Sequence, residues 1–354
     1  MITRAAIKSW QEQHPWREEY QVEQDMWLER LMLSIAQNQD LAGRLALSGG
    51  TGLNKLWLPN PARYSEDLDY VCVVSKADDL LDDARSTALE CGLLPAGRKS
   101  LRRKSPHPKV LLKFRSVLDG SEQKIKMEIA DPHPALDLGP HIKHVERQVS
   151  EEWLASSATI TTISPAYMAA MKLRAIYSRA KGRDLFDFYH LVTTLGVKPE
   201  DLFDLLEHAK LNEPSFHRWS ATTNAETMKL HLRNPSSRFL MDLEFIAPGW
   251  AGTAVFDEAL RLNAEFAERI HQEIRYRKAH RDQQHRLRGY PVDPSWTTDR
   301  LADDTARGQR STKYDKARAR RLKRSGMTNA QIAQKMGVST SWVQRHTAGT
   351  KKGH

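Results

Sequence analysis

The sequence predicts an α/β (α+β) protein in which helices pack on a mixed sheet. Residues 18–40 repeat apolar side chains near the 3.6-residue period of an α-helix. Residues 68–74 (LDYVCVV) have the composition of a buried strand. Residues 110–118 and 124–130 are strand-like runs on either side of Asp119-Gly120, a dipeptide that suits the positive φ of a tight hairpin turn.

Further helices are expected on both sides of these strands. Residues 78–91 have a helical pattern, and a short helix is predicted to start near Thr51. A longer helical stretch runs from Ser164, the predicted N-cap, to about Val192, with an interruption at Gly182. We predict four segments: an α/β domain at 1–195, a helical extension at 196–287, a polar, turn-rich linker at 288–312 and a small helical domain at 313–354.

The composition excludes several classes of protein. The hydrophobic share of 40% and charged share of 28% are typical of a globular chain. No apolar run approaches the roughly 20 residues of a membrane span, and the N-terminus lacks the apolar segment of a signal peptide. Cys72 and Cys91 are too few for a disulfide framework or a zinc site. We therefore expect a cytoplasmic protein with no membrane partner.

The net charge of +10 is concentrated at one end of the chain. Residues 271–354 contain 20 Lys and Arg but only 7 Asp and Glu. A basic surplus confined to one end indicates a part that faces nucleic acid, attached to a nearly neutral body. A basic tail that only keeps the chain soluble is the alternative.

A glycine-rich turn is the first motif with a chemical meaning. In residues 47–55 (LSGGTGLNK), Gly49 and Gly50 let the backbone approach phosphate oxygens, and the helix start beyond them offers free N–H groups. Thr51 adds a hydroxyl, and Lys55 adds a positive charge one turn later. The same pattern also occurs in ordinary turns before helices.

Paired acids are the second motif. Asp67 and Asp69 stand at i and i+2 of the predicted strand, so both side chains lie on one face, with Leu68 on the other. Glu128 lies on the polar face of the second hairpin strand and can complete a three-acid cluster. Carboxylates in this arrangement suit Mg²⁺ or Mn²⁺ bound to substrate phosphates. Acids at a solvated strand end are the alternative.

Together these motifs resemble the nucleotidyltransferase fold, and most closely the AbiEii/AbiGii toxin family. The resemblance covers roughly residues 18–195. It rests on YQVEQDMWLERL at 20–31, GGTGLNK at 49–55, RYSEDLDY at 63–70, KMEI at 126–129 and KLRAIYSRAKGRDLFDF at 172–188.

The resemblance implies roles for individual residues. The glycine turn would hold the triphosphate of an NTP, Asp67 and Asp69 would bind the metal, and Lys172 would contact phosphate. Asp184, with Asp187, would position that lysine or a base. Lys172, Arg179 and Arg183 stand at helical spacings and can form one basic stripe, or a surface ladder of ion pairs. The candidate catalytic residues are Asp67, Asp69, Glu128, Lys172 and Asp184, and the candidate nucleotide-binding residues are Ser48, Gly49, Gly50, Thr51, Lys55, Ser65 and Arg183.

The family also implies an acceptor and a partner. Its members are expected to add nucleotides to RNA, notably to tRNA 3′ ends, and to be paired with an antitoxin protein. Residues 98–115 contain eight Lys or Arg and no acid, so Arg102, Arg103 and Lys104 are candidate RNA contacts. A solvated basic loop is the alternative, and a protein hydroxyl is also a chemically possible acceptor.

The C-terminal domain has the pattern of a helix-turn-helix. Thr328 and Gln331 form a predicted capping box, and residues 337–339 form a turn before a second helix. DNA contacts are expected from the start of that helix, at Thr340, Ser341, Gln344 and Arg345. This domain departs from the usual toxin pattern, in which a separate antitoxin binds DNA. It leaves open self-regulation, targeting or a second contact with RNA.

Two other functions fit the same residues. One is a DNA-binding transcriptional regulator whose nucleotidyltransferase-like domain only senses a nucleotide. The other is a synthase of signalling nucleotides with the same fold. The presence of all three acids favours an active enzyme over the regulator.

Overall fold

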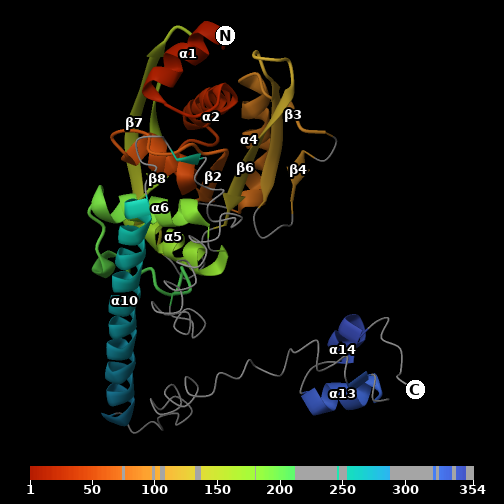
Figure 1. The fold of residues 1–354 in the computed structure, drawn as a ribbon, viewed down its shortest axis with the longest axis vertical. Coiled ribbons are helices and arrows are strands. Elements are labelled where there is room, and N and C mark those ends of the chain that lie inside the picture. The colour runs from red at the N-terminus through yellow and green to blue at the C-terminus, as the bar shows by residue number, and fades with distance from the viewer. Residues whose placement is uncertain are drawn as a thin grey trace. The chain divides into compact units, whose positions relative to one another are not determined.

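The structure is a computed structural model that describes residues 1–73, 76–97, 100–103, 108–131, 137–179, 181–211, 245–246, 253–287, 322–323, 327–336 and 340–347 (Figure 1). The chain divides into two compact units, Met1–Lys278 and Ala279–His354. Within the described helices, none is both long and apolar enough to cross a membrane.

A mixed sheet forms the centre of the first unit, as predicted. In the described chain its strands are β1 (Leu45–Ser48), β2 (Asp67–Cys72), β3 (Leu94–Pro95), β4 (Leu101–Arg102), β5 (Lys109–Arg115), β6 (Glu122–Ala130), β7 (Ile142–Glu151) and β8 (Leu154–Ile163). Their order is β3-β5-β6-β2-β1-β8-β7, and β4 pairs with β5. The central strand β2 runs antiparallel to β1 and parallel to β6. The sequence motifs on β2 and β6 are therefore neighbours.

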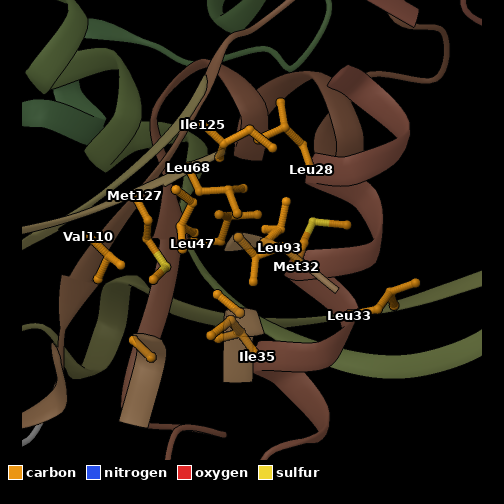
Figure 2. Close-up of a cluster of buried hydrophobic side chains, with 14 of the residues drawn as sticks. Leu28, Met32, Leu33, Ile35, Leu47, Leu68, Leu93, Val110, Ile125 and Met127 are labelled. Carbon is orange, nitrogen blue, oxygen red and sulfur yellow. The ribbon is translucent and has the colours of Figure 1, made fainter. Parts of the chain in front are cut away.

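Helices cover both faces of this sheet. Apolar side chains of α1 (Arg4–Gln13), α2 (Glu19–Gln37) and α4 (Ala77–Glu90) pack on one face with those of β2, β5 and β6. Figure 2 shows part of this cluster, with Leu28 and Met32 of α2 beside Leu68 and Met127. The other apolar cluster joins α5 (Pro165–Arg179), α6 (Gly182–Thr193) and α10 (Thr253–Leu287). Short helices of the described chain lie at Gly49–Gly52 (α3), at Leu53–Trp57 (a π-helix), at Gly139–His141 and at Pro199–Leu202.

Most of the predicted elements are present. The helix predicted at 18–40 is α2, and the run at 78–91 is α4. Ser164 caps α5 by accepting a hydrogen bond from the Tyr167 N–H at 3.2 Å, and Gly182 begins the separate helix α6. The hairpin at β5–β6 also forms, with Gly120 at a φ of 75°. Its connection is longer than a two-residue turn, because Ser116 N–H donates to the Ser121 carbonyl.

Several described elements were not predicted, among them α1, the short strands β1, β3 and β4, and the β7–β8 hairpin. Along most of that hairpin the side chains alternate between exposed and half-buried, with few fully buried apolar residues. The strand signal in the sequence is correspondingly weak. The apolar cluster of α5, α6 and α10 extends past residue 195. The four predicted segment boundaries remain predictions, and the predicted linker at 288–312 lies outside the described residues.

Two short helices are described in the second unit, α13 (Asn329–Met336) and α14 (Thr340–Thr347). The predicted capping box is formed: the Gln331 N–H donates to Thr328 Oγ1 at 3.3 Å, and the Thr328 N–H donates to Gln331 Oε1 at 2.9 Å. Ile332, Ala333 and Val343 are buried between the helices. The predicted turn at 337–339 lies outside the described residues, so the complete helix-turn-helix remains a prediction.

Candidate active site

The glycine turn lies directly against the acids of β2. After β1 the chain turns at Gly49, with a φ of 68°, into the short helix α3 (Gly49–Gly52). A Cβ atom on Gly49 would overlap the Asp69 carboxylate, and one on Gly50 would overlap the Arg63 guanidinium. Both positions therefore require glycine because charged side chains occupy the space of a Cβ.

Sheet register brings the three predicted acids together. Asp69 is opposite Ser48 on β1 and opposite Glu128 on β6, and Asp67 is opposite Lys126. Asp67 and Asp69 are partly buried, whereas Leu68 between them is fully buried in the core. The prediction that both aspartates share one face is confirmed, and that face also carries Glu128.

Burial raises the pKa of Asp69 to about 6, and the neighbouring charges of Asp67 and Glu128 add to the effect. The positive charges of Lys126 and Lys172 act in the opposite direction. An acid whose ionised form is disfavoured by neighbouring acids gains most from a bound cation. Carboxylate oxygens are also the ligands that Mg²⁺ and Mn²⁺ prefer, so Asp67 and Asp69 fit such an ion.

Glu128 is held by two lysines. Lys126 Nζ lies 2.9 Å and Lys109 Nζ 3.0 Å from Glu128 Oε1. Burial opposes ionisation of Glu128, but hydrogen bonds from Lys126 and Lys109 outweigh it and lower the pKa. Among the described side chains, no group of three or more His, Cys, Asp or Glu residues could hold a metal ion as it stands.

A buried ion-pair network supports the other side of the site. Lys172 Nζ on α5 lies 3.1 Å from Asp184 Oδ1 and 2.6 Å from Asp187 Oδ2, both on α6. Arg63 donates two hydrogen bonds to Asp187, at 2.5 and 2.7 Å. Burial opposes ionisation of Asp187, but Arg63 and Lys172 lower its pKa below the usual value. Asp184 and Asp187 both pair with Lys172. The positioning role that the resemblance implied for Asp184 stays a prediction.

Hydroxyl groups connect the turn to β2. Ser48 Oγ donates to the Asp69 carbonyl at 3.0 Å, and Thr51 Oγ1 donates to the Asp67 carbonyl at 2.5 Å. Asn54 adds a third link, because its amide donates to the Gly50 carbonyl at 3.0 Å and its Oδ1 accepts from the Arg63 N–H at 3.1 Å. These bonds fix the turn relative to the acid pair.

Comparison with known proteins identifies the family of this chain. A family model described as the nucleotidyl transferase AbiEii toxin of a type IV toxin–antitoxin system matches residues 30–303. The chain belongs to the AbiEii nucleotidyltransferase toxin family. None of the curated proteins matches it.

Two solved structures resemble this AbiEii protein at low identity. MenT4, a nucleotidyltransferase toxin from Mycobacterium tuberculosis H37Rv, is 17% identical with a TM-score of 0.47, and the match covers 77% of this chain and 94% of that chain. JHP933 from Helicobacter pylori is 16% identical with a TM-score of 0.44, and the match covers 77% of this chain and 98% of that chain.

Lys55 of the AbiEii protein lies in a second buried network. Its Nζ is 2.8 Å from Asp25 Oδ1 and 2.9 Å from Glu29 Oε2, both on α2, and Arg147 also contacts Glu29 at 2.7 Å. Asp25, Lys55 and Arg147 border a cavity of about 70 Å³. Thr51 and Ser65, two other candidate residues, also line it. Sequence reasoning missed Asp25, Glu29 and Arg63, although helix 20–31 and the RYSEDLDY string contain them.

Arg183 does not share one helical stripe with Lys172, because Gly182 begins a new helix between them. Lys172 is directed into the buried network. Arg183 instead pairs with Glu66 at 3.2 Å, and its guanidinium lies 5.1 Å from the centre of the Phe245 ring. The side chain of Arg179 lies outside the described residues.

The candidate nucleic-acid contacts are only partly described. Arg102 is exposed on β4, and Arg103 pairs with Asp82 of α4 at 2.5 Å. Thr340 and Gln344 are exposed on α14. Lys104 and the side chains of Ser341 and Arg345 lie outside the described residues.

Proposed function

We propose that this AbiEii protein transfers a nucleoside monophosphate from an NTP to an RNA acceptor, the 3′ end of tRNA, and releases pyrophosphate. The observation that carries the proposal is the position of Asp69 directly against the glycine turn at Gly49, with Asp67 on the same face of β2 and the charge of Lys172 close enough to act on Asp69. The proposed phosphate-binding backbone, metal-binding acids and fixed cation thus meet at one end of the central strands β1 and β2.

A divalent cation, Mg²⁺ or Mn²⁺, held by Asp67 and Asp69 would neutralise phosphate charge and favour ionisation of the attacking hydroxyl. The residues of the chain itself position the triphosphate of the substrate. The turn after Gly49, fixed by Ser48 and Thr51, presents backbone N–H groups to the triphosphate.

Lys172 has the role of a preorganised phosphate contact. Its ammonium is fixed by two buried carboxylates and needs no reorientation when the substrate binds. Preorganised charge of this kind contributes a large part of catalysis in phosphoryl transfer. Asp184, Asp187 and Arg63 act through Lys172 as positioning residues.

RNA is the proposed acceptor class because basic side chains lie on neighbouring elements. Arg102 and Arg103 follow the β4 edge of the same sheet, and RNA backbones bind such groups electrostatically. As in other toxin systems, we expect a separate antitoxin protein to restrain the activity.

The test is incubation of the purified protein with Mg²⁺, total tRNA and each α-labelled NTP in turn. We expect label on tRNA from one or more NTPs, and Asp67→Ala to lower its rate by about 10²–10³-fold. Asp40→Ala, which removes an exposed carboxylate on the same domain, is the matched control and should label normally.

Other results of this labelling experiment would indicate a different site, product or acceptor. Transfer by Asp67→Ala at the rate of the unchanged protein would refute the assignment of the acid pair. Label in a small soluble nucleotide without RNA would indicate a synthase of signalling nucleotides. Label on protein would indicate a protein hydroxyl as acceptor.

A DNA-binding regulator is the second candidate function, based on the predicted helix-turn-helix, of which α13 and α14 are described and pack through Ile332, Ala333 and Val343. In this case the protein binds an NTP without transfer and shifts a DNA duplex in a gel. The affinity should fall steeply with salt, since phosphate contacts release counterions. Binding that is insensitive to salt would count against DNA as the partner.

A further inference from the structure

Lys126 already stands between two acids of the proposed metal site. It lies on β6 two residues before Glu128 and is directly opposite Asp67 in the β2–β6 ladder. Its Nζ is 2.6 Å from Asp67 Oδ2 and 2.9 Å from Glu128 Oε1. One ammonium group therefore joins two carboxylates that face each other across neighbouring strands.

Lys126 is held by a carboxylate on each side, Asp67 on β2 and Glu128 on β6. Lys109 strengthens the arrangement by contacting the same oxygen of Glu128 at 3.0 Å. Asp69 differs, since no ion pair within 4 Å joins it to another described residue.

We propose that the active site takes a single divalent cation, at Asp67 and Asp69, and that Lys126 serves as the second cation between Asp67 and Glu128. The inference rests on the proposed function, because it concerns the same metal site. Glu128, predicted from the sequence as a metal ligand, then holds the lysines in place.

The net charge of the site is suited to one divalent cation. Three carboxylates face the two ammonium groups of Lys109 and Lys126, so one negative charge is left over. One divalent cation turns this into one positive charge, which complements a triphosphate. A second divalent cation would have to displace Lys126 from two charge-assisted hydrogen bonds and would then be repelled by its ammonium.

The test is a Mn²⁺ titration of the full chain without nucleotide, in which electron paramagnetic resonance counts the free ion. We expect one tightly bound Mn²⁺ in the unchanged protein. Lys126→Met removes the charge at similar length and should bind two, with the second ion at least about tenfold tighter than in the unchanged protein. Lys126→Arg keeps the cation and should again bind one.

Lys124→Met is the matched control, because Lys124 is two residues earlier on the same face of β6 and is exposed. It should bind one ion. Thermal melting shows whether each variant folds, and Lys126→Arg keeps the test valid if Lys126→Met does not fold.

Two tight ions in the unchanged protein, or one in a folded Lys126→Met, would overturn this inference while leaving the proposed function intact. Two tightly bound Mn²⁺ ions in Lys126→Arg would also overturn this inference. If no variant binds Mn²⁺, the acid pair is not a metal site, and the proposed function fails with it.

Discussion

At the scale of single residues, Lys55 shows how a buried charge acquires its role from its partners. Desolvation disfavours its ammonium, but Asp25 and Glu29 outweigh this effect and raise its pKa. All three side chains are almost completely buried. The lysine was predicted to bind nucleotide, and its contacts with α2 give it a structural role as well.

Lys55→Met should therefore destabilise the fold. Loss of the ammonium leaves two buried carboxylates short of a partner, which typically costs about 3–5 kcal/mol. Urea unfolding measures the loss, and Lys8→Met on the exposed side of α1 should stay within about 0.5 kcal/mol. Unchanged stability together with weaker NTP binding would show that Lys55 acts on the nucleotide instead.

His190 makes stability depend on pH. Burial lowers its pKa from 6.5 to about 4, against a smaller opposite effect of Asp187. Between these values the unfolded chain binds a proton that the folded chain excludes. This contribution is complete above pH 6.5 and is lost as the pH falls toward 4, by about 2 kcal/mol at pH 5.

Urea unfolding at neutral pH and at about pH 5 tests this, with His190→Gln for comparison. The variant should lose about 2 kcal/mol less than the unchanged protein on acidification. Equal losses in both proteins would assign the acid sensitivity to other groups.

Much of the candidate site could be read from neighbouring residues in the sequence. The period of two in a strand was enough to place Asp67 and Asp69 on one face. The pairing of Arg63 with Asp187 was beyond such reasoning, because 124 residues separate them and only the packing of α6 brings them together. The same holds for Lys55 and its acids on α2.

At the scale of elements, the glycine turn couples the acid pair to the buried network. Gly50→Ala places a Cβ against the guanidinium of Arg63 and 3.1 Å from Ser65 Oγ. Arg63 must then move and weaken its hold on Asp187, which positions Lys172. We expect the transfer rate to fall by about 10²-fold, the usual cost of a displaced catalytic group.

Gly52→Ala is the matched control within the same short helix. The atoms nearest to a Cβ there belong to Leu47 and Met168, at 3.4 Å or more. This variant should keep a transfer rate close to that of the unchanged protein. Equal rates for both alanine variants would show that the position of Arg63 does not matter for catalysis.

Helices and strands with a clear hydrophobic period or capping residues were predicted from the sequence. Elements with a weak period were not. The buried run of β2 and the Ser164-Pro165 start of α5 carry clear local signals. The four-residue strand β1 is too short for a period to be recognised, although it supports the glycine turn. The β7–β8 hairpin lacks the apolar alternation that marks a half-buried strand.

At the scale of the whole molecule, composition indicated a basic C-terminal part, and the structure separates Ala279–His354 as its own compact unit. The strand order could not be derived from the sequence. The pairing of β2 with β6 joins residues 59 positions apart in the chain, and only the assembled sheet places Glu128 beside Asp69.

A variant that ends at Leu287 separates the two proposed activities. It keeps α10 whole and removes α13 and α14. We expect label transfer to tRNA to continue and the shift of a DNA duplex to disappear. Loss of transfer in a folded variant would mean that the C-terminal part holds the RNA.

The short π-helix Leu53–Trp57 continues α3. Its extra residue is a position at which the length of the chain could differ between relatives. Its Leu58 N–H reaches back five residues to the Leu53 carbonyl, so the turn contains one residue more than an α-helical turn. Deleting a single residue here would restore an α-helical turn. A relative with one residue fewer at this position would therefore have to build the contacts of Asn54 and Lys55 differently.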